Sequence, residues 1–118
     1  MQEDFLHYIW QYKKFALTNL FTVSGESLQI LQIGINTGLS GPDFFNAQLI
    51  IGNQKWAGNV EIHIKSSDWY VHNHEMDSAY ENVILHVVWE DDIGPNTGLA
   101  KERSRFPQSI PIIFMIAF

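Results

Sequence analysis

The sequence predicts one α/β (α+β) domain on a mixed central sheet of about four strands, in the order helix, three antiparallel strands, helix and strand. Three observations predict it. The chain has 118 residues, enough for one domain with a real core but too few for two. Its 46% hydrophobic content is ordinary for a globular protein. A helical segment separates the third and fourth strand-like segments, so the fourth strand can run parallel to a neighbour.

The N-terminal half provides a helix followed by a three-stranded meander. Residues 3 to about 20 follow a helical period, with acidic residues in the first turn and lysines in the last. Gly52 and Asn53 suit a two-residue hairpin turn between the second and third strands. The three strands are expected at residues 28–35, 44–51 and 54–64.

The C-terminal half continues with a second helix and a buried strand. The Ser-Ser-Asp cluster at 66–68 resembles a helix cap, and the helix is expected to end at Asn82. Residues 83–89 are almost continuously apolar, as in a central strand buried on both faces, so His86 is expected to be a hydrogen-bonded core histidine. Residues 1–92 would form the core. Residues 93–118 would be a loop and an apolar segment, truncated or atypical.

Charge and composition restrict the classes of partner. The net charge is −6 and the isoelectric point is near 5.1, so the chain lacks the basic surplus with which proteins grip phosphates. Nucleic acid is therefore a possible partner only through a metal ion, a local patch or further parts of a longer protein. An acidic N-terminus and an apolar run of only nine residues at 110–118 argue against a signal peptide and a membrane span. We expect a cytoplasmic protein without membrane contact, and the absence of cysteine agrees with a reducing compartment.

A row of polar side chains marks the third strand. Residues 58–65 alternate apolar and polar with period two, which places Glu61, His63 and Lys65 on one face. An acid, an imidazole and an amine are costly to bury without partners, so this face suits metal binding or proton transfer. A two-residue turn places Asp43 opposite Ile62. A one-residue bulge, for which Gly58 is a candidate, or a longer turn would bring Asp43 onto the polar face.

Two carboxylates on adjacent strands form an oxygen-rich site suited to Mg²⁺ or Mn²⁺. Asp43 and Glu61 are the predicted metal ligands. Such an ion lowers the pKa of a bound water and neutralises charge on a phosphate, while His63 or Lys65 would position or deprotonate that water. His72 and His74 are expected beside the carboxylates, as outer partners or phosphate contacts.

The element order, with Pro42-Asp43 opening the second strand and Glu61-Ile62-His63 in the third, resembles the PD-(D/E)XK nuclease superfamily. The resemblance implies metal binding by the aspartate and the glutamate, and a catalytic lysine two residues after the glutamate. Here His63 stands at the lysine position, and Lys65 lies two residues further along the same face. Glu3 or Asp4 would supply the acid that some members carry on the first helix.

The chain is also similar to an uncharacterised bacterial family, a domain of unknown function, over roughly residues 1–92. This resemblance implies no activity. It also implies a longer protein, of which this chain would be the N-terminal part, whereas residues 93–118 do not match the family. The residues that carry it are 41–44, 56–63, 67–69, His72, His74, Tyr80 and 82–88.

Each of these predictions has a plainer alternative. Asp43 after Gly-Pro can cap a turn through its own backbone, and Glu61, His63 and Lys65 can form the solvated face of a strand. On a continuous helix His72 and His74 point about 200° apart, which favours one core-edge and one surface histidine. Two further functions stay open: a non-catalytic binding or assembly module on the same fold, and hydrolysis of another substrate at the same metal site. A closed apolar pocket beside the carboxylates would favour the latter.

Overall fold

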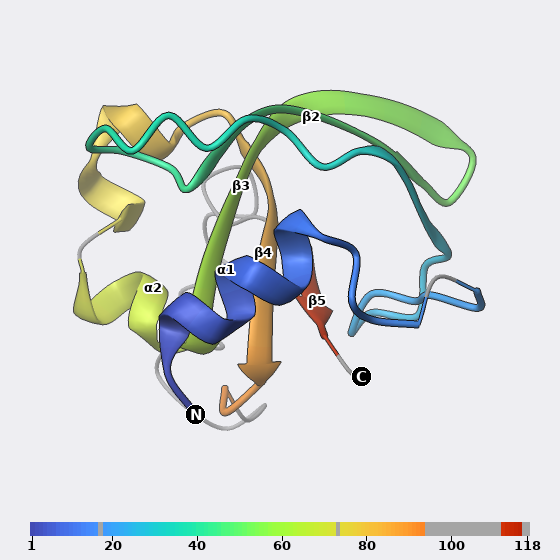
Figure 1. The fold of residues 1–118 in the computed structure, drawn as a ribbon, viewed down its shortest axis with the longest axis horizontal. Coiled ribbons are helices and arrows are strands. Elements are labelled where there is room, and N and C mark those ends of the chain that lie inside the picture. Colours follow the sequence, from blue (N-terminus) through green and yellow to red (C-terminus); the bar gives the residue numbers. More distant parts are fainter. Residues whose placement is uncertain (17, 73, 94–111, 117–118) are drawn as a thin grey trace.

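The computed structural model describes residues 1–16, 18–72, 74–93 and 112–116, which form one α+β domain (Figure 1). It contains few helices and one five-stranded sheet. No helix within these ranges is long and apolar enough to cross a membrane. The elements are α1 (Glu3–Gln11), β1 (Leu28–Gln32), β2 (Phe44–Ile51), β3 (Gln54–Lys65), α2 (Asp68–Val71), the 3₁₀ turns η1 (His74–Met76) and η2 (Ser78–Tyr80), β4 (Val83–Glu90) and β5 (Ile112–Met115).

The sheet is mixed, as the sequence predicted, and has the strand order β1-β2-β3-β4-β5. β1, β2 and β3 form an antiparallel meander, whereas β4 runs parallel to β3 and β5 runs parallel to β4. The parallel pair follows from the connection through α2 and the 3₁₀ turns, which returns the chain to the starting end of β3. The expectation of about four strands is one short, because the apolar segment at 112–115 adds β5.

Two expected helices are shorter in the structure. α1 ends at Gln11 instead of near residue 20, because Lys13 has a left-handed φ of 52° that a helix cannot continue. The second helix is a single turn followed by η1 and η2. The Asp77 carboxylate accepts a hydrogen bond from Ala79 N at 2.9 Å, a local contact that competes with a continuous helix. The first strand also ends early, at Gln32, and Ile35 forms only an isolated bridge with Phe45.

The hairpin of β2 and β3 contains a one-residue bulge, which shifts Asp43 from a position opposite Ile62 to one opposite Glu61. The two-residue turn pairs Ile51 with Gln54, and this register holds as far as the pair Ala47 and Gly58. Phe44 then pairs with Val60, so β2 carries one extra residue. The positive φ of Asn46, 58°, lies within this bulge.

Gly58 is not the bulged residue. A Cβ at this position would lie 2.6 Å from Ile84 Cγ2 and 2.8 Å from Asn82 O. Glycine is therefore needed where β3 and the start of β4 approach each other closely.

The two faces of the sheet bury different chemistry. α1 covers the apolar face (Figure 1), and Trp10 Nε1 donates a hydrogen bond to Ile33 O at 3.0 Å. The opposite face carries Glu61, His63 and His86. The apolar core includes Leu6, Ile9, Trp10, Leu49, Val60, Ile62, Leu85 and Val87.

Candidate acid and histidine site

Asp43 occupies the place where β2 stops covering the edge of β3. Because Phe44 pairs with Val60, Asp43 comes next to Glu61, just before the regular pairing begins. The Asp43 Oδ2 atom accepts a hydrogen bond from Ile62 N at 2.8 Å. A β3 amide that has no β2 partner is thereby satisfied by a carboxylate. Asp43 thus caps the neighbouring strand.

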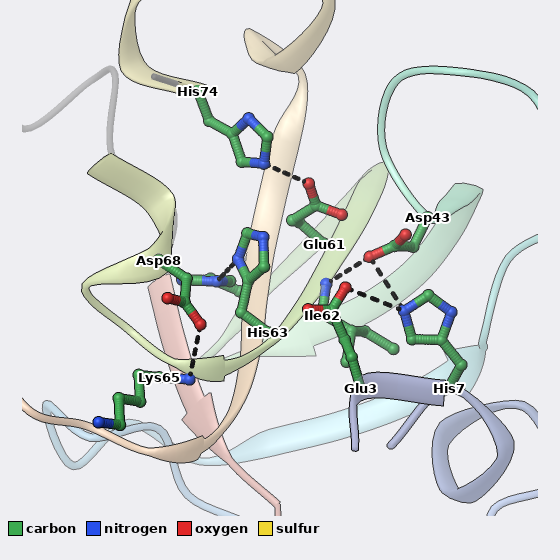
Figure 2. A network of polar contacts seen from close by, with 10 residues as sticks. Glu3, His7, Asp43, Glu61, Ile62, His63, Lys65, Asp68 and His74 are labelled. Carbon is green, nitrogen blue, oxygen red and sulfur yellow. Dashed lines mark hydrogen bonds and ion pairs between the residues drawn. The ribbon is translucent and has the colours of Figure 1, made fainter. Parts of the chain in front are cut away.

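The carboxyl groups of Asp43 and Glu61 face each other as neighbours (Figure 2). Glu61 is 3% exposed. Burial, then the hydrogen bond and the charge of Asp43, raise the pKa of Glu61 to about 10. Two adjacent carboxylates repel each other in a poorly solvated place, so one of them retains its proton near neutral pH. A divalent cation could replace that proton.

α1 brings two more polar groups to the same place. Glu3 and His7 lie one helical turn apart, and His7 Nε2 is 3.8 Å from Glu3 Oε1 and 3.5 Å from Asp43 Oδ2 (Figure 2). One ligand atom from each of Glu3, His7 and Asp43 lies within 4.8 Å of the other two. The carboxylate of Glu3, and then the charges of Asp43 and Asp4, raise the pKa of His7 against the opposing effect of burial.

Sequence reasoning proposed Glu3 as a stand-in acid and did not find His7. The i, i+4 spacing of Glu3 and His7 at the start of the predicted helix places both side chains on one face, and this pattern could have identified His7. The alternative acid, Asp4, is exposed and lies outside the cluster.

His63 and His86 form a buried pair across β3 and β4. His63 Nδ1 lies 2.7 Å from His86 Nε2, so one nitrogen donates and the other accepts. Both rings are 2% exposed, and burial lowers the pKa of His63 to about 4. His63 is therefore a neutral imidazole near neutral pH. The prediction that His86 is a hydrogen-bonded core histidine is confirmed.

His72 and His74 converge on His63 because the second helix breaks between them. His72 follows the last residue of α2, and His74 begins η1, so the opposed directions of a continuous helix do not apply. His74 Nε2 lies 2.8 Å from Glu61 Oε2 (Figure 2), and burial lowers the pKa of His74. One nitrogen from each of His63, His72 and His74 lies within 4.8 Å of the other two.

Lys65 is the predicted site residue that the structure leaves apart. Its side chain is exposed and extends away from the carboxylates (Figure 2). Its backbone N–H donates to Asp68 Oδ2 at 3.2 Å, where β3 turns into α2. The structure thus gathers Asp43, Glu61, His63, His72 and His74 and places Lys65 at the rim.

These features define a single-domain α+β protein with a centre of acidic and histidine side chains beside the central strand β3. Residues 3–108 match the model of a family described as "Protein of unknown function (DUF2851)", and the chain belongs to this family. The match extends beyond residue 92, where the sequence resemblance was expected to end. Neither the curated proteins nor the solved structures gave a match.

Proposed function

We propose that the protein is a metal-dependent phosphodiesterase of the nuclease type, in which Asp43 and Glu61 bind Mg²⁺ or Mn²⁺. The observation that supports this is the meeting of the two carboxyl groups, with Glu3 beside Asp43. Carboxylate oxygens are the ligands that these hard cations prefer. A divalent cation would also remove the unfavourable pairing that otherwise holds a proton on Glu61.

The bound ion would neutralise charge on the phosphodiester and lower the pKa of the attacking water. His63 would serve as the proton acceptor, because a neutral imidazole can take the proton that water loses as its oxygen attacks phosphorus. The hydrogen bond with His86 would fix the ring and its tautomer. Lys65 at the rim suits a phosphate contact better than water activation.

A nucleic acid substrate would have to be held mainly through the ion. The net charge of −6 offers little non-specific attraction to phosphate. Lys65 is an exposed cation on the strand that carries Glu61. We therefore propose that the protein contacts a nucleic acid only near the scissile phosphate, through the ion and Lys65, and not along an extended basic groove.

A second function is favoured by two observations. The chain has His63 at the lysine position of the superfamily, and Lys65 extends away from the carboxylates. A non-catalytic binding or assembly module that keeps the fold without the cleavage chemistry would have these features.

Cleavage and metal binding separate the two. Mg²⁺ and Mn²⁺ binding would be titrated, and plasmid and short single- and double-stranded oligonucleotides would be incubated with wild type, Glu61→Gln and Glu81→Gln. Glu81 is an exposed carboxyl and serves as the matched control. Glu61→Gln should lower cleavage about a hundredfold or more, since a metal ion supplies several kcal/mol of charge stabilisation.

Glu81→Gln should cleave like wild type, and a chelator should abolish cleavage in both. Cleavage that survives both Glu61→Gln and the chelator would contradict the proposal. A wild type that binds neither ion and cleaves nothing would leave the binding module.

A further inference from the structure

Three histidines and Glu61 face one another on the side of the sheet opposite α1. We propose that His63, His72 and His74 form a second metal site, which binds a transition-metal ion of the Zn²⁺ class with Glu61 as its fourth ligand. This site is distinct from the group of Glu3, His7 and Asp43. It shares one residue, Glu61, with the Mg²⁺ or Mn²⁺ site proposed above.

The three imidazoles already have the proximity that such an ion requires. The ring centroid of His63 lies 4.9 Å from that of His72 and 5.2 Å from that of His74, and the remaining pair is 5.4 Å apart. Their candidate ligand nitrogens lie within 4.8 Å of one another. Ligands of a tetrahedral Zn²⁺ site are about 3.3 Å apart, so the three nitrogens would have to draw closer on binding. His72 is exposed and its ring has room to move.

The contact between His74 and Glu61 is the second observation that indicates an ion. Their atoms Nε2 and Oε2 are 2.8 Å apart, yet His74 Nε2 is buried and has no hydrogen-bond partner within the described part of the chain. The two atoms are close without the alignment of a hydrogen bond. A buried polar atom of this kind normally has a partner. A cation bound by both the nitrogen and the oxygen would be one, with the two atoms moving slightly apart to hold it.

Neighbouring side chains fix the orientation of the His63 and His74 rings, as they do for histidine ligands in known metal sites. A ligating histidine usually engages its other ring nitrogen with a second group, which fixes its tautomer and orientation. His63 Nδ1 is engaged with His86 Nε2 at 2.7 Å, which leaves Nε2 for an ion. The His74 ring stacks on Tyr80 with centroids 3.8 Å apart, and Trp69 packs against its edge.

The donor set selects the metal. Three imidazoles and one carboxylate match Zn²⁺ and its spectroscopic substitute Co²⁺, whereas Mg²⁺ prefers oxygen ligands. The carboxylate side and the histidine side would thus bind different cations. This inference goes beyond the proposed phosphodiesterase and is tested by metal binding alone. An ion bound by the histidines would occupy His63 Nε2, so in that state His63 would be a ligand and would not accept the proton from water.

The test is a Co²⁺ titration of chelator-treated wild type, followed by visible absorption and by displacement with Zn²⁺. Wild type should bind one tightly held Co²⁺ with the intense bands of a tetrahedral site, and Zn²⁺ should abolish them. His72→Ala removes an exposed ligand and should keep the fold, which far-ultraviolet circular dichroism would check. It should weaken Co²⁺ binding at least about tenfold, since even outer-shell changes cost 10–100-fold.

His7→Ala is the comparison variant, because His7 lies on the carboxylate side. Its Co²⁺ affinity and spectrum should equal those of wild type. Loss of the tetrahedral bands in His7→Ala but not in His72→Ala would overturn the assignment, as would the absence of these bands in wild type. A tetrahedral Co²⁺ site without cleavage of any oligonucleotide would refute the proposed function and leave this inference intact.

Discussion

Replacing Glu61 with glutamine should stabilise the metal-free protein near neutral pH. Glu61 is 3% exposed and adjoins Asp43, and these surroundings raise its pKa from 4.5 to about 10. The folded protein must therefore hold a proton that the unfolded chain releases. Glutamine has nearly the same shape and does not titrate, so it avoids this cost.

The size of the effect follows from the linkage between proton binding and folding. A carboxyl whose pKa is raised on folding contributes its full stability below the unfolded value and loses it as the pH rises toward the folded value. Between pH 4.5 and about 10 the loss is about 1.4 kcal/mol per pH unit. Glu61 should therefore cost about 3 kcal/mol at neutral pH. The lowered pKa of His63 makes stability change with pH in the opposite direction. Wild type and Glu61→Gln both contain His63, so its contribution cancels when the two are compared.

Urea denaturation with a chelator present would measure the effect, at about pH 5 and about pH 8. The stability gained by Glu61→Gln should be small at the lower pH and several kcal/mol at the higher one. Glu81→Gln, at an exposed carboxyl, should change the free energy of unfolding by less than about 0.5 kcal/mol at either pH. A gain for Glu61→Gln that is equal at the two pH values would refute the reasoning.

Two further substitutions test the packing around the site. Gly58→Ala would place a Cβ 2.6 Å from Ile84 Cγ2, so we expect a loss of about 1–3 kcal/mol in thermal unfolding, and an unchanged Tm would contradict the close approach of β3 and β4. Ser66→Ala removes a buried hydroxyl that accepts from Asp92 N at 3.1 Å, and a loss of about 1–3 kcal/mol is expected. The control Ser40→Ala, at an exposed loop position, should have almost no effect, and equal Tm values for the two serine variants would disprove a structural role for the Ser66 hydroxyl.

The parts of the fold that follow a simple period could be predicted from sequence. The alternation along residues 58–65 and the turn at Gly52-Asn53 gave β3 and its hairpin, and the apolar run at 83–89 gave β4. The second helix could not be predicted in the same way. Trp69 and Met76 have the spacing of one face of a continuous helix, but Met76 is 82% exposed because the helix breaks after one turn.

The candidate site depended on details that one sequence leaves open. Asp43 falls beside Glu61 only because β2 carries an extra residue, and the sequence offered two registers without choosing between them. His7 was not predicted, because a single histidine in a helix can have many roles. Only the packing of α1 against the sheet brings His7 close to Asp43. Lys65 has the right parity in the strand but lies at the last residue of β3, where the chain turns toward α2.

The histidine at position 63 is better explained by its neighbours than as a damaged lysine site. A lysine there would place an ammonium group against His86, whose Nε2 is now paired with His63 Nδ1 at 2.7 Å. Position 63 also faces His72 and His74. The positive charge of a lysine there would repel a metal ion from these histidines. A neutral imidazole at 63 is compatible with all three neighbours. A histidine-based centre therefore requires His63 together with His86 and the broken helix, whereas a lost lysine would account for His63 alone. The two explanations of His63 therefore differ in whether the histidines bind a metal ion. Metal binding, measured separately from cleavage, distinguishes a nuclease fold that has lost its lysine from a histidine-based metal centre.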